Sequence, residues 1–205
     1  MTIPDAQLDA FRYARYDAIN RARLAHLETL PLPFKGARVA DFGAGIGDHI
    51  DFYLDRGASE VTAYEGRREN ALAIARRFEG KPVRVQIVDV TALLIPDARF
   101  DIGHAYGLLY HLDAPHEFIR IASKMVCTLA LETMCSPGYE IAREDVSDSS
   151  NGLSGRAVRL PVGDVLATLR ENFKYACVPP TQPDHEDFAS GQRKVFVASH
   201  TPIFL

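Results

Sequence analysis

An acidic residue followed by closely spaced glycines is the stretch of this sequence that points most clearly to chemistry. Residues 39–50 read VADFGAGIGDHI, in which Asp41 precedes Gly43, Gly45 and Gly47. The apolar residues before the glycines are typical of a short buried strand, and the glycines favour a sharp turn into a helix. Glycine lets the backbone approach a ligand without a Cβ in the way, and a new helix offers free N–H groups. The pattern predicts a nucleotide-binding site.

The glycine spacing distinguishes this stretch from the dinucleotide-binding fingerprint. The sequence reads GxGxG, whereas the fingerprint is GxGxxG and holds a pyrophosphate at the helix N-terminus. An acidic residue at the strand end, here Asp41, would repel phosphate but would suit a ligand with an ammonium group. S-adenosylmethionine carries an amine and a sulfonium and no phosphate. We therefore expect S-adenosylmethionine as the cofactor; a tight glycine turn without a ligand is the alternative.

The motif VADFGAGIGDH resembles motif I of the class I S-adenosylmethionine-dependent methyltransferases. Further stretches similar to that family follow in the expected order, from roughly residue 35 to the C-terminus. The nucleotide half of the resemblance is specific, and the acceptor half is not. In this family the strand end and the turn hold the cofactor, a role that the resemblance assigns here to Asp41, Gly43, Ala44, Gly45 and Gly47.

Acidic residues also end the next two strand-like runs. Residues 61–65 read VTAYE, and residues 83–88 read VRVQIV and are followed by Asp89. Glu65 can accept both ribose hydroxyls in charge-assisted hydrogen bonds; a helix cap is the alternative. The resemblance implies that Asp89 accepts from the adenine amino group and that Val90 packs on the ring. A turn or cap residue is the alternative for Asp89.

The stretch FDIGHAYGLLYHLDAP, residues 100–115, carries the candidates for the acceptor side. It is similar to stretches of small-molecule methyltransferases and of the wobble-uridine carboxymethyltransferases of tRNA. Methyl transfer needs donor and acceptor aligned, and a hydroxyl acceptor must also lose a proton. Histidine can take up a proton near neutral pH, so we expect His111 and Tyr110 as catalytic residues and Tyr106 beside the cofactor. Packing under the adenosine is the alternative for His111, and His104 is expected to be buried.

The histidines and cysteines do not predict a metal site. His104, His111 and His116 are seven and five residues apart, which fits neither the HExxH helix nor the usual zinc clusters. The cysteines are odd in number and lack CxxC spacing, so we expect reduced thiols at Cys127, Cys135 and Cys177.

Alternating strand and helix patterns predict one α/β domain over residues 1–205, with a helical segment at 1–34 and a core at 35–205. By the resemblance, the core is a doubly wound, Rossmann-like, mostly parallel seven-stranded sheet with an antiparallel final strand. The expected strands cover 39–42, 61–65, 83–88, 100–107, 126–133, 174–178 and 194–199. The expected helices cover 5–30, 47–56 and 161–172, with others starting near 67 and 113.

Two segments are expected to cover the site. The helical residues 5–30 could close over the ligands through Tyr13, Tyr16, Asn20 and Arg23, with ordinary packing as the commoner alternative. The polar residues 134–160 are expected to form a lid-like loop rooted at Glu132, since a loop of this length is usually functional or disordered. Its residues Arg156 and Arg159 could bind an anionic acceptor or face solvent. The roles of His185, Glu186 and Asp187, in the connection before the last strand, are left open.

Composition limits the classes of function. The 205 residues are 47% hydrophobic and 24% charged, with a net charge of −4, so no general basic field for nucleic acid exists. No run approaches the roughly 20 apolar residues of a membrane span, and the N-terminus lacks a signal-peptide pattern. We therefore expect a cytoplasmic methyltransferase without membrane or nucleic-acid partners.

The expected acceptor is a small molecule methylated at oxygen, a sugar or another secondary metabolite. The alternatives are a tRNA wobble-uridine-modifying transferase, an NAD-dependent oxidoreductase and a non-catalytic partner subunit with the same fold. The oligomeric state is left open.

Overall fold

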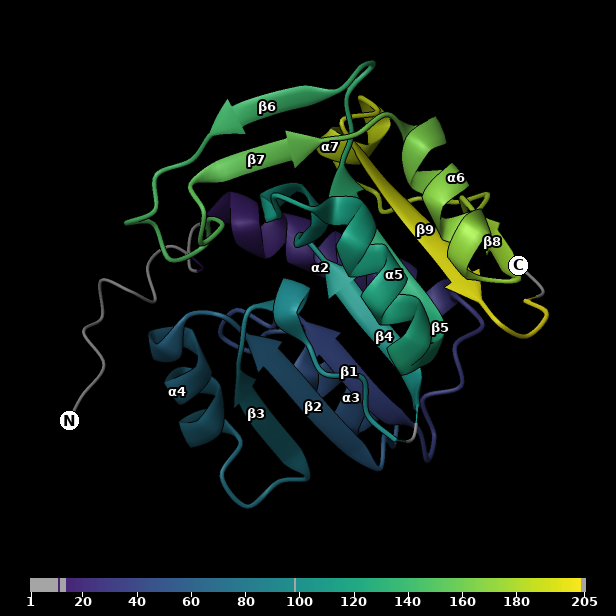
Figure 1. Cartoon of the computed structure of the whole chain (residues 1–205). Coiled ribbons are helices and arrows are strands. Elements are labelled where there is room, and N and C mark those ends of the chain that lie inside the picture. The colour runs from purple at the N-terminus through teal and green to yellow at the C-terminus, as the bar shows by residue number, and fades with distance from the viewer. Residues whose placement is uncertain (1–10, 12–13, 98, 204–205) are drawn as a thin grey trace.

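A seven-stranded sheet forms the frame of the molecule, a computed structural model that describes residues 11, 14–97 and 99–203. The strands lie in the order β3-β2-β1-β4-β5-β9-β8 (Figure 1). The strands β1 to β5 are parallel, and β9 pairs antiparallel with both β5 and β8. This confirms the Rossmann-like sheet with an antiparallel final strand. The strands are β1 (Arg38–Phe42), β2 (Glu60–Glu65), β3 (Val83–Ile87), β4 (Phe100–Tyr106), β5 (Val126–Met134), β8 (Tyr175–Cys177) and β9 (Arg193–Ser199).

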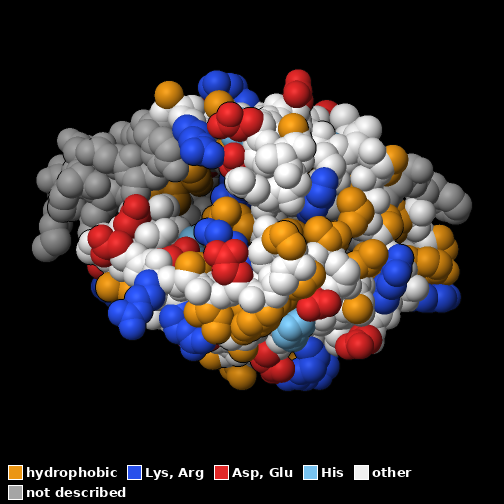
Figure 2. All heavy atoms as spheres, turned by 90° about the horizontal axis from the view of Figure 1, so that it is seen from above, with side chains coloured by type: hydrophobic (Ala, Val, Ile, Leu, Met, Phe, Trp, Pro, Cys, Tyr) orange, Lys and Arg blue, Asp and Glu red, His pale blue; other side chains and the backbone are white. Residues whose placement is uncertain are grey.

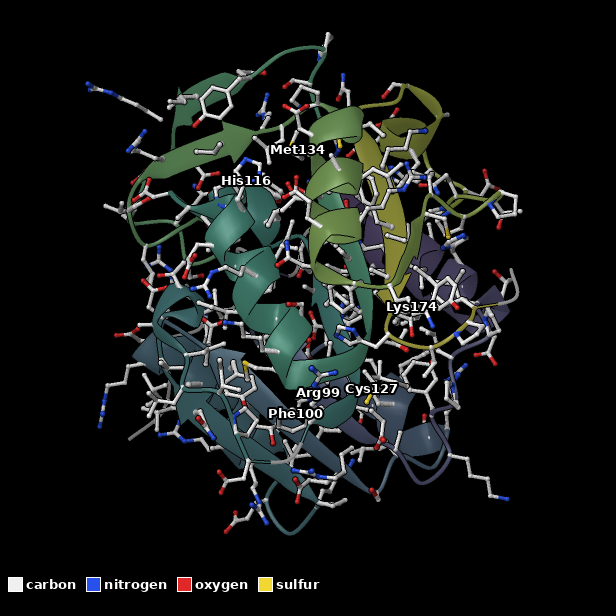
Figure 3. All side chains as sticks on the ribbon, turned by 45° about the vertical axis from the view of Figure 1, so that its right-hand side comes forward. Arg99, Phe100, His116, Cys127, Met134 and Lys174 are labelled. Carbon is white, nitrogen blue, oxygen red and sulfur yellow. The ribbon has the colours of Figure 1, made fainter. Side chains whose placement is uncertain are left out.

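Helices cover both faces of the sheet, and each face has its own apolar core. On one face α5 (Pro115–Met125) and α6 (Val162–Asn172) lie side by side, as Figure 3 shows. The other face is covered by α2 (Ala14–Thr29), α3 (Ile50–Asp55), α4 (Arg68–Arg77) and α7 (Glu186–Ala189). The central strands are buried on both faces, which explains their nearly continuous apolar sequences.

The helices follow the sequence pattern with small differences. The expected helix 47–56 begins only at Ile50, because residues 47–49 belong to the glycine turn. The expected helix 5–30 is observed as α2, and its first residues, with Tyr13, lie outside the described residues. The short α7 in the connection between β8 and β9 was not predicted. None of the described helices is long and apolar enough to cross a membrane.

The polar segment 134–160 is not one continuous loop, so that part of the prediction is wrong, whereas residues 144–155 have no regular structure and several of them line the cavity described below. The strand β5 extends to Met134, and β6 (Glu140–Arg143) then pairs antiparallel with β7 (Arg156–Arg159). We call residues 135–159 the arm; it lies beyond the carboxyl ends of the parallel strands, at the top of Figure 1. Each of its strands has only four residues, too few for hydrophobic alternation to give a clear signal, and β7 buries Ala157 and Val158.

Candidate active site

A cavity of about 580 Å³ lies between the carboxyl ends of the central strands and the arm. This volume is in the range of small-molecule sites, and the position is where open α/β sheets bind ligands. The structure brings together on its walls ten of the eleven residues predicted as catalytic or cofactor-binding. They are Asp41, Gly43, Ala44, Gly45, Glu65, Asp89, Val90, Tyr106, Tyr110 and His111.

The glycine turn supplies the floor of the cavity. Gly43, Gly45 and Gly47 have φ angles of 68°, 57° and 82°, in the left-handed region that favours glycine. The amides of Gly43 and Ala44 donate to the carbonyl oxygen of Tyr64, which ties the turn to β2. Gly47, predicted to bind the cofactor, does not line the cavity. A Cβ there would lie 3.0 Å from the Phe78 ring, so this glycine permits close packing under the turn.

The carboxylate of Asp41 lies buried at the end of β1. Its Oδ1 is 3.3 Å from His104 Nδ1, and the buried Tyr53 hydroxyl also interacts with the carboxylate. Burial raises the pKa of Asp41 to about 6, an effect that the nearby His49 opposes. Burial also lowers the pKa of His49 and of His104 to about 3, so both rings are neutral at pH 7. A carboxylate on the cavity wall fits an ammonium group.

The carboxylate of Glu65 ends β2 on the opposite side of the turn. Its two oxygens accept from the amides of Gly45 and Arg67, each at 2.8 Å. Burial raises the pKa of Glu65, and the two backbone hydrogen bonds oppose this rise. Each carboxylate oxygen can accept a second hydrogen bond, so a pair of ribose hydroxyls fits this group.

Asp89 and Val90 follow β3, and Tyr106 ends β4, on the other side of β1 in the sheet. Asp89 Oδ1 accepts from the amide and the hydroxyl of Thr91, at 2.8 and 2.7 Å, and so caps the short helix η1 (Val90–Ala92). The turn role that we weighed for Asp89 is therefore present, and its Oδ2 is left for a ligand. The Tyr106 hydroxyl is buried without a hydrogen-bond partner in the part of the chain that the structure describes.

The two predicted catalytic residues lie on the helix η2 (Leu109–His111), where their rings are 4.0 Å apart. Tyr110 Oη accepts a hydrogen bond from Arg193 Nη2 at 3.3 Å. His111 Nδ1 lies 2.7 Å from Glu144 Oε2 on the arm. Because a carboxylate only accepts, Nδ1 carries the proton and Nε2 has the free lone pair. Sequence reasoning missed Glu144 and Arg193, since acidic and basic residues in polar stretches give no local signal.

A buried charge network lies behind the cavity wall that Arg23 and Arg193 help to form. Glu132 Oε2 accepts from Arg23 Nη2 at 2.6 Å, and its Oε1 accepts from Arg193 Nη1 at 2.9 Å. Burial alone would raise the pKa of Glu132, but the two arginine charges outweigh it and hold the pKa below its usual value. Of the predicted covering residues, Tyr16 and Arg23 line the cavity, while Asn20 accepts a hydrogen bond from Arg23.

The three histidines weighed as metal ligands point to separate partners. His104 lies next to Asp41, His111 next to Glu144, and His116 Nδ1 is 2.8 Å from the Thr168 hydroxyl, where it joins α5 to α6. Figure 3 shows His116 near the start of α5. Among the described residues, no group of three or more side chains could hold a metal ion.

Comparison with known proteins supports the fold and the type of domain. Residues 40–128 match the family model of a methyltransferase domain. No curated protein gives a significant match. The N-terminal domain of EvdMO1, solved in the presence of SAH and D-fucose, is 24% identical with a TM-score of 0.71 over 97% of each chain. The magnesium protoporphyrin IX methyltransferase ChlM of Synechocystis PCC 6803, with bound SAM, is 12% identical with a TM-score of 0.68 over 96% of this chain and 90% of that one.

A third solved structure is similar at the same level. The 1,6-didemethyltoxoflavin-N1-methyltransferase of Burkholderia thailandensis is 19% identical, with a TM-score of 0.63 over 98% of this chain and 92% of that one. At these identities the structures establish the fold, and the sequence match establishes the domain type. Residues 40–128 of the chain are therefore similar to a methyltransferase domain, and the chain has the fold of S-adenosylmethionine-dependent methyltransferases.

Proposed function

We propose that this protein transfers a methyl group from S-adenosylmethionine to a hydroxyl oxygen of an uncharged small molecule, such as a sugar. The observation that carries this proposal is the His111–Glu144 pair, which lines the same cavity as Asp41 and Glu65. An imidazole held by a carboxylate is the arrangement that proteins use to remove a proton from a hydroxyl.

The residues of the floor fit the cofactor. The Asp41 carboxylate would hold the ammonium group, Glu65 the ribose hydroxyls, and Asp89 with Val90 the adenine. When bound, S-adenosylmethionine supplies a methyl group on a sulfonium, which a nucleophilic oxygen can displace. His111 Nε2 would accept the proton of the attacking hydroxyl, and Glu144 would stabilise the resulting imidazolium. The enzyme's remaining task is alignment, which the walls of the cavity provide.

The arginines around the acceptor side favour an uncharged acceptor. Arg23 and Arg193 are bound to Glu132, Arg15 to Asp187, and Arg159 to Glu140. An anionic acceptor would have to compete with these carboxylates. On the face in Figure 2, basic and acidic side chains alternate without a broad basic patch, which also speaks against a nucleic-acid substrate. D-fucose, named with EvdMO1, is a molecule of the proposed class.

Two measurements test the proposal in sequence. Calorimetric titration with S-adenosylhomocysteine and, in parallel, with NAD should give binding of the first only. Formation of S-adenosylhomocysteine should then be measured with free sugars, nucleotide sugars, phenols, amines and tRNA as acceptors. Methylation of a neutral hydroxyl compound is expected. Turnover only with amines or tRNA, or binding of NAD alone, would overturn the proposal.

Glu65→Ala should weaken the binding of S-adenosylhomocysteine by about 1.5–3 kcal/mol, because charge-assisted hydrogen bonds to the ribose are lost. That corresponds to a roughly 10- to 150-fold rise in Kd by calorimetry. Glu69→Ala is the matched control, since Glu69 is an exposed glutamate at the start of α4. Equal affinities for both variants would remove Glu65 from the cofactor site.

The affinity for S-adenosylhomocysteine should fall as the pH drops below about 6. Asp41, with its pKa of about 6, then becomes protonated and loses its attraction for the ligand's ammonium group. The pKa of about 3 keeps His49 and His104 from titrating in this window. We expect an increase in Kd of up to about tenfold per pH unit between pH 6 and 5. Calorimetry at several pH values measures it.

Asp41→Asn is the control for this pH dependence. It should bind weakly and show a nearly flat Kd between pH 5 and 7. The pH dependence of the free energy of unfolding of the ligand-free protein is a second test. The folded state holds the Asp41 proton more tightly than the unfolded chain does, so the contribution of Asp41 to the free energy of unfolding falls as the pH rises from about 4 to 6. A pH slope in the asparagine variant like that of the wild type would assign the titration to another group.

A further inference from the structure

We infer that Glu144 is a positioning residue for His111. The arm holds Glu144 in this position because its tip contacts the ribose side of the proposed cofactor site. This inference rests on the proposed function, because it concerns the residue proposed as the base. It adds that His111 can act as a base only when the arm, which is distant in sequence, is in contact with it.

The contact itself is short and sheltered. Glu144 Oε2 lies 2.7 Å from His111 Nδ1 and also accepts from the amide of Gly152 at 2.9 Å. Both the histidine and the glutamate side chains are only 11% exposed. A carboxylate in this position fixes both the orientation of the ring and its tautomer, with the proton on Nδ1. The lone pair then stays on Nε2, the nitrogen that must accept the proton.

The backbone of the arm lies in close contact with the backbone of η2. A Cβ at Gly152 would lie 2.5 Å from the carbonyl oxygen of His111 and 3.1 Å from its Cβ. Any side chain at this position would therefore push the arm away from His111. The close approach places the Gly152 amide where it shares Glu144 Oε2, so the arm orients the carboxylate as well as carrying it.

The tip of the arm also reaches the cofactor side. Arg67 Nη2 donates to the carbonyl oxygens of Asn151 and Gly152 at 3.1 and 3.4 Å, and Asn70 Nδ2 donates to that of Ser149 at 3.2 Å. The amide of Arg67 donates to Glu65 Oε1. Residues 149–152 therefore bridge the proposed ribose carboxylate and the proposed base.

Other charged groups around His111 are already paired. The strand β7 packs against η2 and carries Arg156, bound to Asp113, as well as Arg159, bound to Glu140. Tyr110 contacts the imidazole through its ring. Among the described residues, Glu144 is the group that hydrogen-bonds to a ring nitrogen of His111. The tautomer of this ring is therefore a direct readout of the Glu144 contact.

The test is 15N NMR of histidine-labelled protein saturated with S-adenosylhomocysteine, which needs no acceptor. His111→Gln assigns the signals. The wild type should show a protonated Nδ1 and an unprotonated Nε2. Glu144→Ala should lose this tautomer, whereas Glu144→Gln, whose amide oxygen still accepts from Nδ1, should retain it in part. Glu140→Ala, a glutamate of the same arm that does not touch His111, is the matched control.

A second variant tests the contact between the arm and η2 without changing Glu144. Gly152→Ala should lose the Nδ1-protonated tautomer although the carboxylate is intact, and it serves equally if Glu144→Ala does not fold. In turnover, Glu144→Ala should lower kcat roughly tenfold or more with the KM for both substrates nearly unchanged. Glu144→Gln should restore part of this loss.

The outcomes separate this inference from the proposed function. A wild-type ring protonated on Nε2, or an unchanged tautomer in both Glu144→Ala and Gly152→Ala, would overturn the positioning role. Loss of S-adenosylhomocysteine binding in Glu144→Ala would also overturn it, because the glutamate would then only anchor the arm. The expected tautomers together with full turnover in His111→Gln would leave the positioning contact standing and refute the proposed base.

Discussion

Replacing His111 with alanine should lower kcat about 10²- to 10⁴-fold, the usual contribution of a general base. The expectation follows from the hydrogen bond to Glu144, which leaves Nε2 able to accept a proton on the wall of the cavity. The affinity for S-adenosylhomocysteine should stay within about twofold, since the predicted cofactor residues Asp41 and Glu65 lie on β1 and β2 rather than on η2. Steady-state kinetics with the identified acceptor and calorimetry with S-adenosylhomocysteine measure the two quantities.

Tyr110→Phe is the matched comparison for this prediction. The Tyr110 hydroxyl accepts from Arg193, so its loss changes the cavity wall next to His111 without removing the proposed base. We expect a smaller loss of kcat and a change in the acceptor KM. A kcat close to wild type in His111→Ala, combined with weaker cofactor binding, would instead support the packing role under the adenosine.

The cofactor half of the site could be predicted from the sequence because its signals are local. Asp41, Glu65 and Asp89 each come at the end of an apolar, strand-like run. The carboxyl ends of parallel strands meet at one edge of the sheet, so recognising the strands also placed these side chains together. The cavity lining contains all three.

The acceptor half could not be predicted in the same way, because its partners are distant in sequence. His111 and Glu144 are 33 residues apart, and Arg23 and Glu132 are 109 residues apart. No pattern of spacing connects such residues; only the folded chain does. The arm escaped detection for a related reason, since its strands have only four residues each and only two of those in β7, Ala157 and Val158, are buried.

Gly47 illustrates a different limit. Its sequence neighbours suggested a ligand contact, and its positive φ does belong to the predicted turn. Whether a turn glycine faces the ligand or the core depends on the side chains packed below it, here Phe78, Ile50 and Ile74. Those residues come from elements that the glycine motif itself does not specify.

Glu132→Ala should lower the free energy of unfolding by about 3–5 kcal/mol, the usual cost of removing one partner from a buried ion pair. The Glu132 side chain is fully buried, and it binds Arg23, 5% exposed, and Arg193, 12% exposed. Its loss would leave two guanidinium charges in a poorly solvated site. The network joins α2, β5 and β9, so the loss affects elements from both ends of the chain. Urea denaturation should show a lower midpoint with an unchanged slope.

The control for this stability prediction is Glu117→Ala, which removes an exposed glutamate that pairs with Arg120 within one helix turn of α5. Exposed pairs of this kind contribute little, so no measurable shift of the midpoint is expected. Glu132→Gln, which keeps the shape and loses the charge, replaces the alanine variant if that one does not fold. A loss below about 1 kcal/mol in Glu132→Ala would show that water or a shifted carboxylate compensates the arginines. The network would then serve chiefly to hold Arg193 against Tyr110, and the defect would appear in the acceptor KM rather than in stability.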